Sequence, residues 1–80
     1  MKAIVNVFLK EGILDPQGKA TLHALETLGF SNVGEVRIGK RIVLKIAAKT
    51  MQEAEEEAEK MAKEALVNAV IEDYSIEIEP

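Results

Sequence analysis

The sequence predicts an α+β domain in which two β-α-β units share one antiparallel sheet. One observation is the alternation of apolar residues over 2–9, which is typical of a strand. Helix starts follow at Asp15 and Thr50, each leading into apolar residues at helical spacing. Further apolar alternation occurs over 35–47 and 70–78, after each helix. The predicted element order is therefore β-α-β-β-α-β.

Length and composition limit what the chain can be. Its 80 residues make one domain, residues 1–80, and a chain of this size buries only about 60% of its extended surface, so it often relies on a partner. Hydrophobic residues make up 48% and charged residues 30%, which is typical of a soluble globular protein. Cysteine is absent, which excludes a thiolate nucleophile or metal ligand. No apolar run approaches the roughly 18 residues of a membrane span, so we expect a cytoplasmic protein with no membrane partner.

The first strand and the first helix both have clear sequence signals. The strand over 2–9 is apolar on both sides, which is typical of a central strand. Asp15 is the expected N-cap of the helix and Pro16 its first residue. Gly29 is expected to end the helix in a left-handed conformation. The expected buried stripe of this helix consists of Leu22, Leu25 and Leu28.

The middle of the chain predicts a β-hairpin. Strands are expected over 35–38 and 41–47, each with apolar residues at every second position. Gly39 and Lys40 stand between them as a tight turn, because glycine tolerates a positive φ. The hairpin would follow the first helix directly.

The second helix and the last strand complete the predicted fold. Thr50 and Glu53 form a capping box at the start of the helix, and Asn68 is its expected stop. A strand over 70–78 follows. Right-handed crossovers then place both helices on one face of a four-stranded antiparallel sheet, which is the ferredoxin-like plait.

The other face of this sheet would be uncovered. Alternation places several large apolar side chains there, and an exposed apolar patch commonly marks an interface. We therefore predict a homo-oligomer joined through the sheet, a dimer or a dimer that pairs further into a tetramer. The alternative is a monomer with scattered surface hydrophobes. The predicted oligomer interface consists of Ile4, Phe8, Val43 and Ile71.

The sequence offers no catalytic constellation. His23 is the one side chain that titrates near neutrality without a shift, and it has no spaced acidic or cysteine partner. Glu72 and Asp73 are adjacent on a predicted strand, so their side chains point to opposite faces. The glycines lack the spacing that cradles a phosphate. We therefore predict no catalytic residue, no cofactor site and no metal site in this chain.

Nucleic-acid binding is a further class to consider, because RNA-recognition domains share the plait. Those domains stack bases on aromatic side chains of the central strands. Phe8 is the single aromatic candidate here, and the net charge of −4 is acidic. We therefore predict no nucleic-acid partner.

Three segments carry a resemblance to a known family. They read LDPQG over Leu14–Gly18, VRIGK over Val36–Lys40 and NAVIEDY over Asn68–Tyr74. In this order and spacing they resemble the PurS family, the small subunit of phosphoribosylformylglycinamidine (FGAM) synthase. The resemblance spans almost the whole chain. One departure is Ala69, which stands where the family often has proline.

The resemblance implies a role in purine biosynthesis. The family's complex converts formylglycinamide ribonucleotide (FGAR), glutamine and ATP to FGAM. PurS is implied to be a non-catalytic bridging subunit of this ligase, needed for assembly of the glutaminase and synthetase subunits and for ammonia transfer between them. ATP and Mg²⁺ are implied for the complex and not for this chain.

Within the resembling segments, four residues are predicted to face a partner subunit. Gln17 and Gly18 are expected to be exposed on the first turn of the first helix, where Gly18 would permit close approach of another backbone. Arg37 is expected to bind a carboxylate of a partner, with Lys40 at the hairpin tip. The alternative for Arg37 is a solvated surface charge.

One other interpretation stays open at this point, a regulatory domain of the ACT kind that senses a small molecule. Such domains share the plait and bind an amino acid at a glycine-bearing loop after the first strand. Gly12 and Gly18 fall in this region, but Asp15-Pro16-Gln17 does not match that loop.

Overall fold

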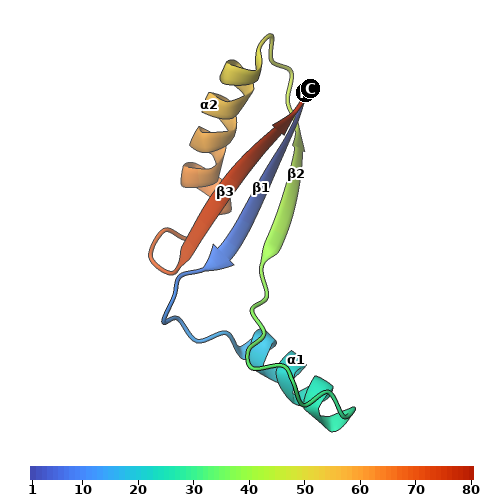
Figure 1. Cartoon of the computed structure of the whole chain (residues 1–80). Coiled ribbons are helices and arrows are strands. Elements are labelled where there is room, and N and C mark those ends of the chain that lie inside the picture. The colour runs from blue at the N-terminus through green and yellow to red at the C-terminus, as the bar shows by residue number, and fades with distance from the viewer.

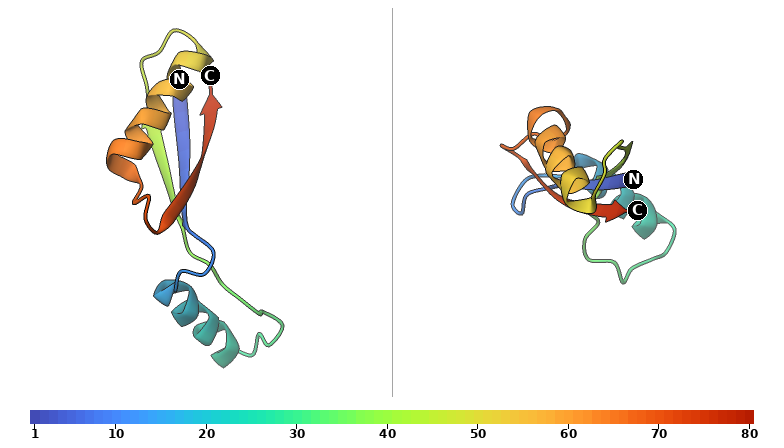
Figure 2. Two further views of the ribbon diagram at one scale, coloured as in Figure 1. Left: turned by 90° about the vertical axis from the view of Figure 1, so that its left-hand side faces the viewer. Right: turned by 90° about the horizontal axis from the view of Figure 1, so that it is seen from above.

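The computed structural model describes residues 1–80 and is elongated, with extents of 50 × 26 × 14 Å. One end holds a β-sheet with a helix packed on it. The other end holds a single helix, α1 (Pro16–Thr27), and two extended stretches of chain join the ends (Figures 1 and 2). No helix has the length and apolar character needed to cross a membrane.

Three antiparallel strands form the sheet in the order β2-β1-β3. They are β1 (Lys2–Leu9), β2 (Lys40–Lys45) and β3 (Glu72–Glu79). The prediction that the first strand is central is confirmed, because β1 pairs on both edges. Val5 lies opposite Ile42 on one side and Ile76 on the other, so all three side chains share one face.

One face of the sheet is covered by α2 (Met51–Met61) and by η1 (Ala62–Leu66), a short π-helical continuation. The predicted cap is confirmed, because Thr50 Oγ1 accepts a hydrogen bond from the Glu53 N–H at 3.1 Å. The helix meets the sheet through small, fully buried side chains spaced four residues apart. These side chains are Ala54, Ala58 and Ala62.

A side-chain hydrogen bond links α2 to β3. The Tyr74 hydroxyl donates to the Glu59 carboxylate, and Lys63 Nζ lies 3.6 Å from the same carboxylate. The hydrogen bond to Glu59, with partial burial and the nearby negative charge, raises the pKa of Tyr74 above its usual 10.0. The half-buried ring of Tyr74 packs in the core between these elements.

Both predicted ends of α1 are confirmed. Asp15 caps its start, and Pro16 is its first residue. After the helix Gly29 has a φ of +97°, and the Phe30 N–H donates to the Leu25 carbonyl oxygen at 3.0 Å. This is the left-handed glycine ending that the sequence predicts.

The predicted four-stranded ferredoxin-like plait is wrong. Residues 33–39 form no strand, and the chain runs on from them into β2 without the expected hairpin turn (Figure 1). Gly39 serves a different purpose, because a Cβ there would lie 2.5 Å from the Val7 carbonyl oxygen. Since no turn folds 33–39 back, α1 lies beyond the end of the sheet and not on its face (Figure 2).

The boundaries of the other elements shift by one or two residues. The predicted strands over 41–47 and 70–78 are observed as Lys40–Lys45 and Glu72–Glu79. Asn68 is not the helix stop, because the helical segment ends at Leu66. Instead Asn68 forms the following turn, where its Oδ1 accepts from the Val70 N–H at 3.1 Å.

Candidate functional site

Two stretches of chain, residues 10–15 and 33–39, join the sheet to α1, and we call them together the elbow (Figure 1). They contain Leu14 and Asp15 of the first resembling segment and Val36–Gly39 of the second. These segments are distant in sequence, yet they contact each other directly in the structure. The elbow therefore brings two of the three resembling segments together in space.

The carboxylate of Asp15 connects the two stretches of the elbow. It is 4% exposed, with Oδ1 accepting from the Gly18 N–H at 2.8 Å and Oδ2 from the Ile38 N–H at 2.7 Å. The bond from Ile38, followed by that from Gly18, holds the pKa of Asp15 below its usual 3.8, because both favour the charged form. Burial opposes this shift, and the charge of Arg37 adds to it.

Gly18 is buried, so its predicted exposure on the first turn of α1 is wrong. A Cβ at this position would lie 2.1 Å from the Val36 carbonyl oxygen and 2.9 Å from Asp15 Oδ2. Glycine within a helix costs about 1 kcal/mol relative to alanine. Its presence here is explained by the close approach of the second elbow stretch, from this same chain.

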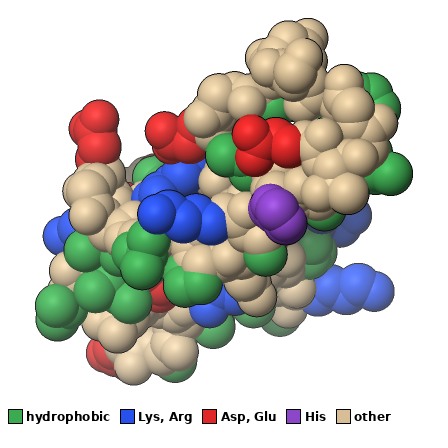
Figure 3. All heavy atoms as spheres, turned by 90° about the horizontal axis from the view of Figure 1, so that it is seen from below, with side chains coloured by type: hydrophobic (Ala, Val, Ile, Leu, Met, Phe, Trp, Pro, Cys, Tyr) green, Lys and Arg blue, Asp and Glu red, His purple; other side chains and the backbone are tan.

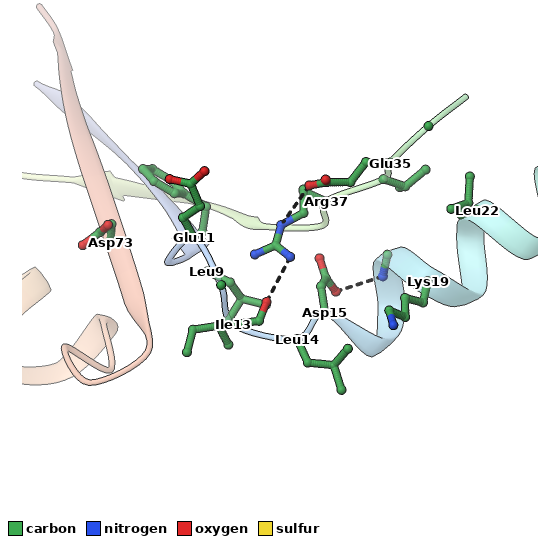
Figure 4. Close-up of a pocket in the computed structure, with 15 residues that line it drawn as sticks. Leu9, Glu11, Ile13, Leu14, Asp15, Lys19, Leu22, Glu35, Arg37 and Asp73 are labelled. Atoms are coloured by element: carbon green, nitrogen blue, oxygen red, sulfur yellow. Dashed lines mark hydrogen bonds and ion pairs between the residues drawn. The ribbon is translucent and has the colours of Figure 1, made fainter. Parts of the chain in front are cut away.

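The guanidinium of Arg37 lies between the two stretches (Figure 4). Its Nη1 donates to the Ile13 carbonyl oxygen at 3.0 Å and its Nη2 to the Lys10 carbonyl oxygen at 3.3 Å. Its Nε lies 3.8 Å from Glu35 Oε1. Arg37 therefore braces the backbone of its own chain. Its side chain is 39% exposed. The expected contact between Arg37 and a carboxylate of a partner stays a prediction.

The remaining two predicted partner residues lie outside these contacts. Gln17 is exposed on the first turn of α1. Lys40 begins β2, so it does not occupy a hairpin tip, and its Nζ lies 3.8 Å from Glu72 Oε2. The structure thus places Arg37 within the elbow and Gly18 of α1 against it, and leaves the side chains of Gln17 and Lys40 on the surface.

A hollow of about 850 Å³ opens beside the elbow (Figure 4). Its wall combines apolar side chains with charges of both signs. Two elbow side chains in this wall already form hydrogen bonds with the backbone. Asp15 accepts from two N–H groups, and Arg37 donates to two carbonyl oxygens. Other lining residues are Phe8, Glu11, Lys19, Leu22 and Asp73.

The open face of the sheet carries three of the four predicted oligomer residues. Phe8 is 46% and Val43 44% exposed, whereas Ile4 in the central strand is buried. Ile71 precedes β3 and lies in the turn, where its carbonyl oxygen accepts from the Lys10 N–H at 2.9 Å. Charges of opposite sign lie on the two outer strands of this face. The positive ones on β2 are Arg41 and Lys45, and the negative ones on β3 are Asp73, Glu77 and Glu79.

The role of Asp15 beyond helix capping was missed from the sequence. Asp-Pro before a helical pattern identifies an N-cap, and this part of the prediction is confirmed. The second hydrogen bond, from Ile38, joins residues that are distant in the chain. No periodicity or spacing signals such a contact. The co-occurrence of the two resembling segments was the one available hint.

Asp15 makes the stability of the elbow depend on pH. A group whose pKa is lower when folded contributes stability that is present above its unfolded pKa and is lost as pH falls through the folded pKa. We expect the contribution of Asp15 to the free energy of unfolding to be fully present at pH 7. It should be lost progressively below about pH 4, as Asp15 gains a proton. Asp15→Asn should be less stable than wild type at pH 7, and the gap should narrow at pH 3. Urea unfolding at both pH values measures this. An equal gap at both would contradict the role of the charge.

Comparisons with known proteins match the chain over almost its whole length. The PurS family model, described as phosphoribosylformylglycinamidine (FGAM) synthase, matches residues 2–80. The FGAM synthase subunit PurS of Methanocaldococcus jannaschii is 42% identical over 78 residues, which cover 98% of this chain and 94% of that protein. The Bacillus subtilis subunit PurS is 44% identical over 78 residues, covering 98% and 92%.

Solved structures share the fold of the chain over almost its whole length. The crystal structure of M. jannaschii PurS has a TM-score of 0.88 and 44% identity, covering 98% of this chain and 94% of that one. A chain in the structure of PurLQS from Thermotoga maritima has a TM-score of 0.87 and 30% identity, covering 95% and 93%. The resemblance noted in the sequence is confirmed, and the chain belongs to the PurS family of FGAM synthase subunits.

Proposed function

We propose that this chain is the bridging subunit of FGAM synthase, a ligase of purine biosynthesis, and that it forms and breaks no bonds itself. In this role it holds the glutaminase and synthetase subunits together and supports the passage of ammonia between them. ATP and Mg²⁺ would bind to the other subunits. The relatives are all subunits named PurS, which favours this role over an ACT-like sensing domain.

The observation that carries the proposal is the extended shape of the chain. A compact domain of 80 residues has a radius of gyration of about 12 Å. The value here is 16.0 Å, because the sheet and α1 occupy opposite ends of a molecule 50 Å long. A small chain with two separated surfaces can contact two larger bodies at once, which is what a bridge requires.

The elbow supports the same role. The backbone hydrogen bonds of Asp15 and Arg37 brace the connection between the two ends. A braced connection fixes the distance between two bound subunits, and pre-ordering reduces the entropy lost on binding. A similar chain from T. maritima occurs in a structure of PurLQS, so a relative with this fold assembles with other subunits.

We also propose surfaces for these contacts. Gln17, Arg37 and Lys40 lie on or near the elbow and would face the larger subunits. The open face of the sheet would join copies of this chain into a homo-oligomer, a dimer or a tetramer. Its exposed apolar residues are Phe8 and Val43.

Sedimentation of purified subunits tests the bridge. The glutaminase and synthetase subunits from the same organism are mixed with ATP and glutamine, with and without this chain. We expect the two large subunits to sediment as one species only when the chain is present. If they form that species equally well without it, the bridging role is overturned.

Lys40→Gln gives a residue-level version of this experiment. The change removes a charge whose side chain is 62% exposed, so we expect weaker assembly, by about threefold to tenfold in concentration dependence, a loss of roughly 1 kcal/mol. Lys63→Gln is the matched control, because it removes a charge of similar exposure on η1, away from the elbow. Equal effects of the two changes would remove Lys40 from the interface.

A further inference from the structure

The relative orientation of the two ends of the chain depends on the elbow. The helix α2 packs on β1 and β3, whereas α1 packs on no strand to a comparable extent. Gly18 is the one buried residue of α1, and the prediction that Leu28 belongs to a buried stripe is wrong, because Leu28 is 73% exposed. Figure 3, seen from the end that carries α1, shows apolar side chains at the surface there. Within one chain, packing against the sheet therefore does not fix the direction of α1.

The elbow also has no strand pairing of its own. The pairing of β1 with β2 ends at Val7 and Lys40, before the two stretches begin. No backbone–backbone hydrogen bond joins residues 10–15 to residues 33–39. Every hydrogen bond between the two stretches therefore involves a side chain.

Three such hydrogen bonds connect the stretches, and two neighbouring residues of the second stretch supply all the donors. Arg37 donates to the carbonyl oxygens of Ile13 and Lys10, and the Ile38 N–H donates to the Asp15 carboxylate. The Lys10 carbonyl oxygen also accepts from the Ile13 N–H at 3.1 Å, so Arg37 binds to a turn of the first stretch. A planar guanidinium donates in fixed directions, so it holds both carbonyl groups in one arrangement.

We propose that Arg37 and Asp15 are positioning residues for ammonia transfer in the FGAM synthase complex, a proposal that rests on the bridging role. Their bonds fix the angle between the two ends of the chain, and this angle aligns the glutaminase with the synthetase. The glutaminase converts glutamine and water to glutamate and ammonia. The synthetase uses the ammonia with FGAR and ATP to form FGAM, ADP and phosphate. Ammonia released at a misaligned junction escapes to solvent, so each FGAM then requires more glutamine.

The length of the molecule makes this alignment sensitive to the elbow. The chain is 50 Å long, so a rotation of about 10° at the elbow moves a distant end by several ångströms. A misplacement of about 1 Å can slow a reaction step about 100-fold. A chain that still binds both subunits but bends at the elbow therefore keeps the complex together and loses the transfer.

Arg37→Lys separates this role from the binding of a partner's carboxylate. Lysine keeps the positive charge that such a carboxylate would bind, but a single ammonium replaces the two directed donors. The bonds of Arg37 lie outside the sheet and α2, so those elements stay folded. Glu35→Gln is the matched control in the same stretch. It removes the exposed ion pair with Arg37 Nε and leaves the bonds from Arg37 to both carbonyl groups in place.

The first test measures glutamate and FGAM formed by the reconstituted complex with glutamine. We expect the ratio of glutamate to FGAM to rise at least about threefold with Arg37→Lys and to stay at the wild-type value with Glu35→Gln. With ammonia in place of glutamine, the rate of FGAM formation should be equal for all three chains, because no transfer between subunits is needed. Sedimentation should show the complete complex in each case.

Three results would overturn the proposal. They are a wild-type ratio with Arg37→Lys, an equal rise with Glu35→Gln, and loss of the complex with Arg37→Lys. Failure of the bridging role is distinguishable, because it is seen with the wild-type chain itself, which would then not raise FGAM formation from glutamine.

The second test measures the elbow in the free chain by electron spin resonance. Because the chain has no cysteine, Glu26→Cys on α1 and Glu57→Cys on α2 place two spin labels at exposed positions without background. The doubly labelled chain is diluted into unlabelled chain, so that each measured distance lies within one molecule. We expect Arg37→Lys to broaden the distance distribution at least about twofold and Glu35→Gln to leave it unchanged. Equal widths for wild type and Arg37→Lys would overturn the proposal.

Discussion

Gly18→Ala is expected to destabilise the protein, although alanine is favoured over glycine in helices by about 1 kcal/mol. The added Cβ would lie 2.1 Å from the Val36 carbonyl oxygen, so the start of α1 and the 33–39 stretch must separate. Separation weakens the hydrogen bond between Asp15 and Ile38. We expect a net loss of more than about 1 kcal/mol in the free energy of unfolding, measured with urea.

The control for this change is Gly34→Ala, in the second stretch of the elbow. No atom lies within 4 Å of a Cβ at Gly34, and its φ is not positive. We expect Gly34→Ala to be neutral or to stabilise by about 0.4–1 kcal/mol, because alanine restricts the unfolded chain. If Gly18→Ala behaved like Gly34→Ala, the close packing of the elbow would be refuted.

Ala58→Leu is expected to have an effect of similar size at the other end of the molecule. Ala58 is fully buried and packs with Ala3 and Ile46 between α2 and the sheet. A larger side chain would push the helix away from the sheet, which costs about 1–3 kcal/mol in a well-packed core. The midpoint of urea unfolding should fall accordingly.

Ala65→Leu is the matched control, because Ala65 is exposed on the continuation of the same helix. The same substitution there adds side-chain volume without entering the core. We expect a change within about 0.5 kcal/mol. A large loss at Ala65 and none at Ala58 would show that the contact between helix and sheet is wrongly placed.

Local features of the fold could be predicted from the sequence because their causes are local. The N-caps at Asp15 and Thr50 and the glycine ending at Gly29 depend on residues within one turn. The central position of the strand over 2–9 follows from its apolar residues on both sides. These features would be the same in a monomer and in an assembly.

The position of α1 could not be predicted in this way. A run of alternating apolar residues over 35–38 predicts a strand, but the segment pairs with no other strand. The pattern does not identify what the segment pairs with or whether the chain turns at Gly39. Gly39 is equally compatible with a tight turn, but in the structure its lack of a side chain lets the backbone lie close to the Val7 carbonyl oxygen. Such non-local choices depend on packing that a local pattern does not encode.

The candidate site was predicted in outline and not in its contacts. The resemblance drew attention to Arg37, which lies in the elbow, and to Gly18, which packs against the elbow from the first turn of α1. The partner roles expected for them assumed exposed side chains, whereas Gly18 is buried and Arg37 donates to carbonyl groups of its own chain. The hydrogen bonds that brace the elbow join residues more than twenty positions apart, and sequence spacing gave no sign of them.

The most direct measurement of the bridging role is the rate of FGAM formation in a reconstituted complex. The glutaminase and synthetase subunits are assayed with FGAR and ATP, using glutamine or ammonia as the nitrogen source, with and without this chain. The bridging role predicts that glutamine supports FGAM formation only in the complete mixture. Equal rates with and without the chain, for both nitrogen sources, would contradict it.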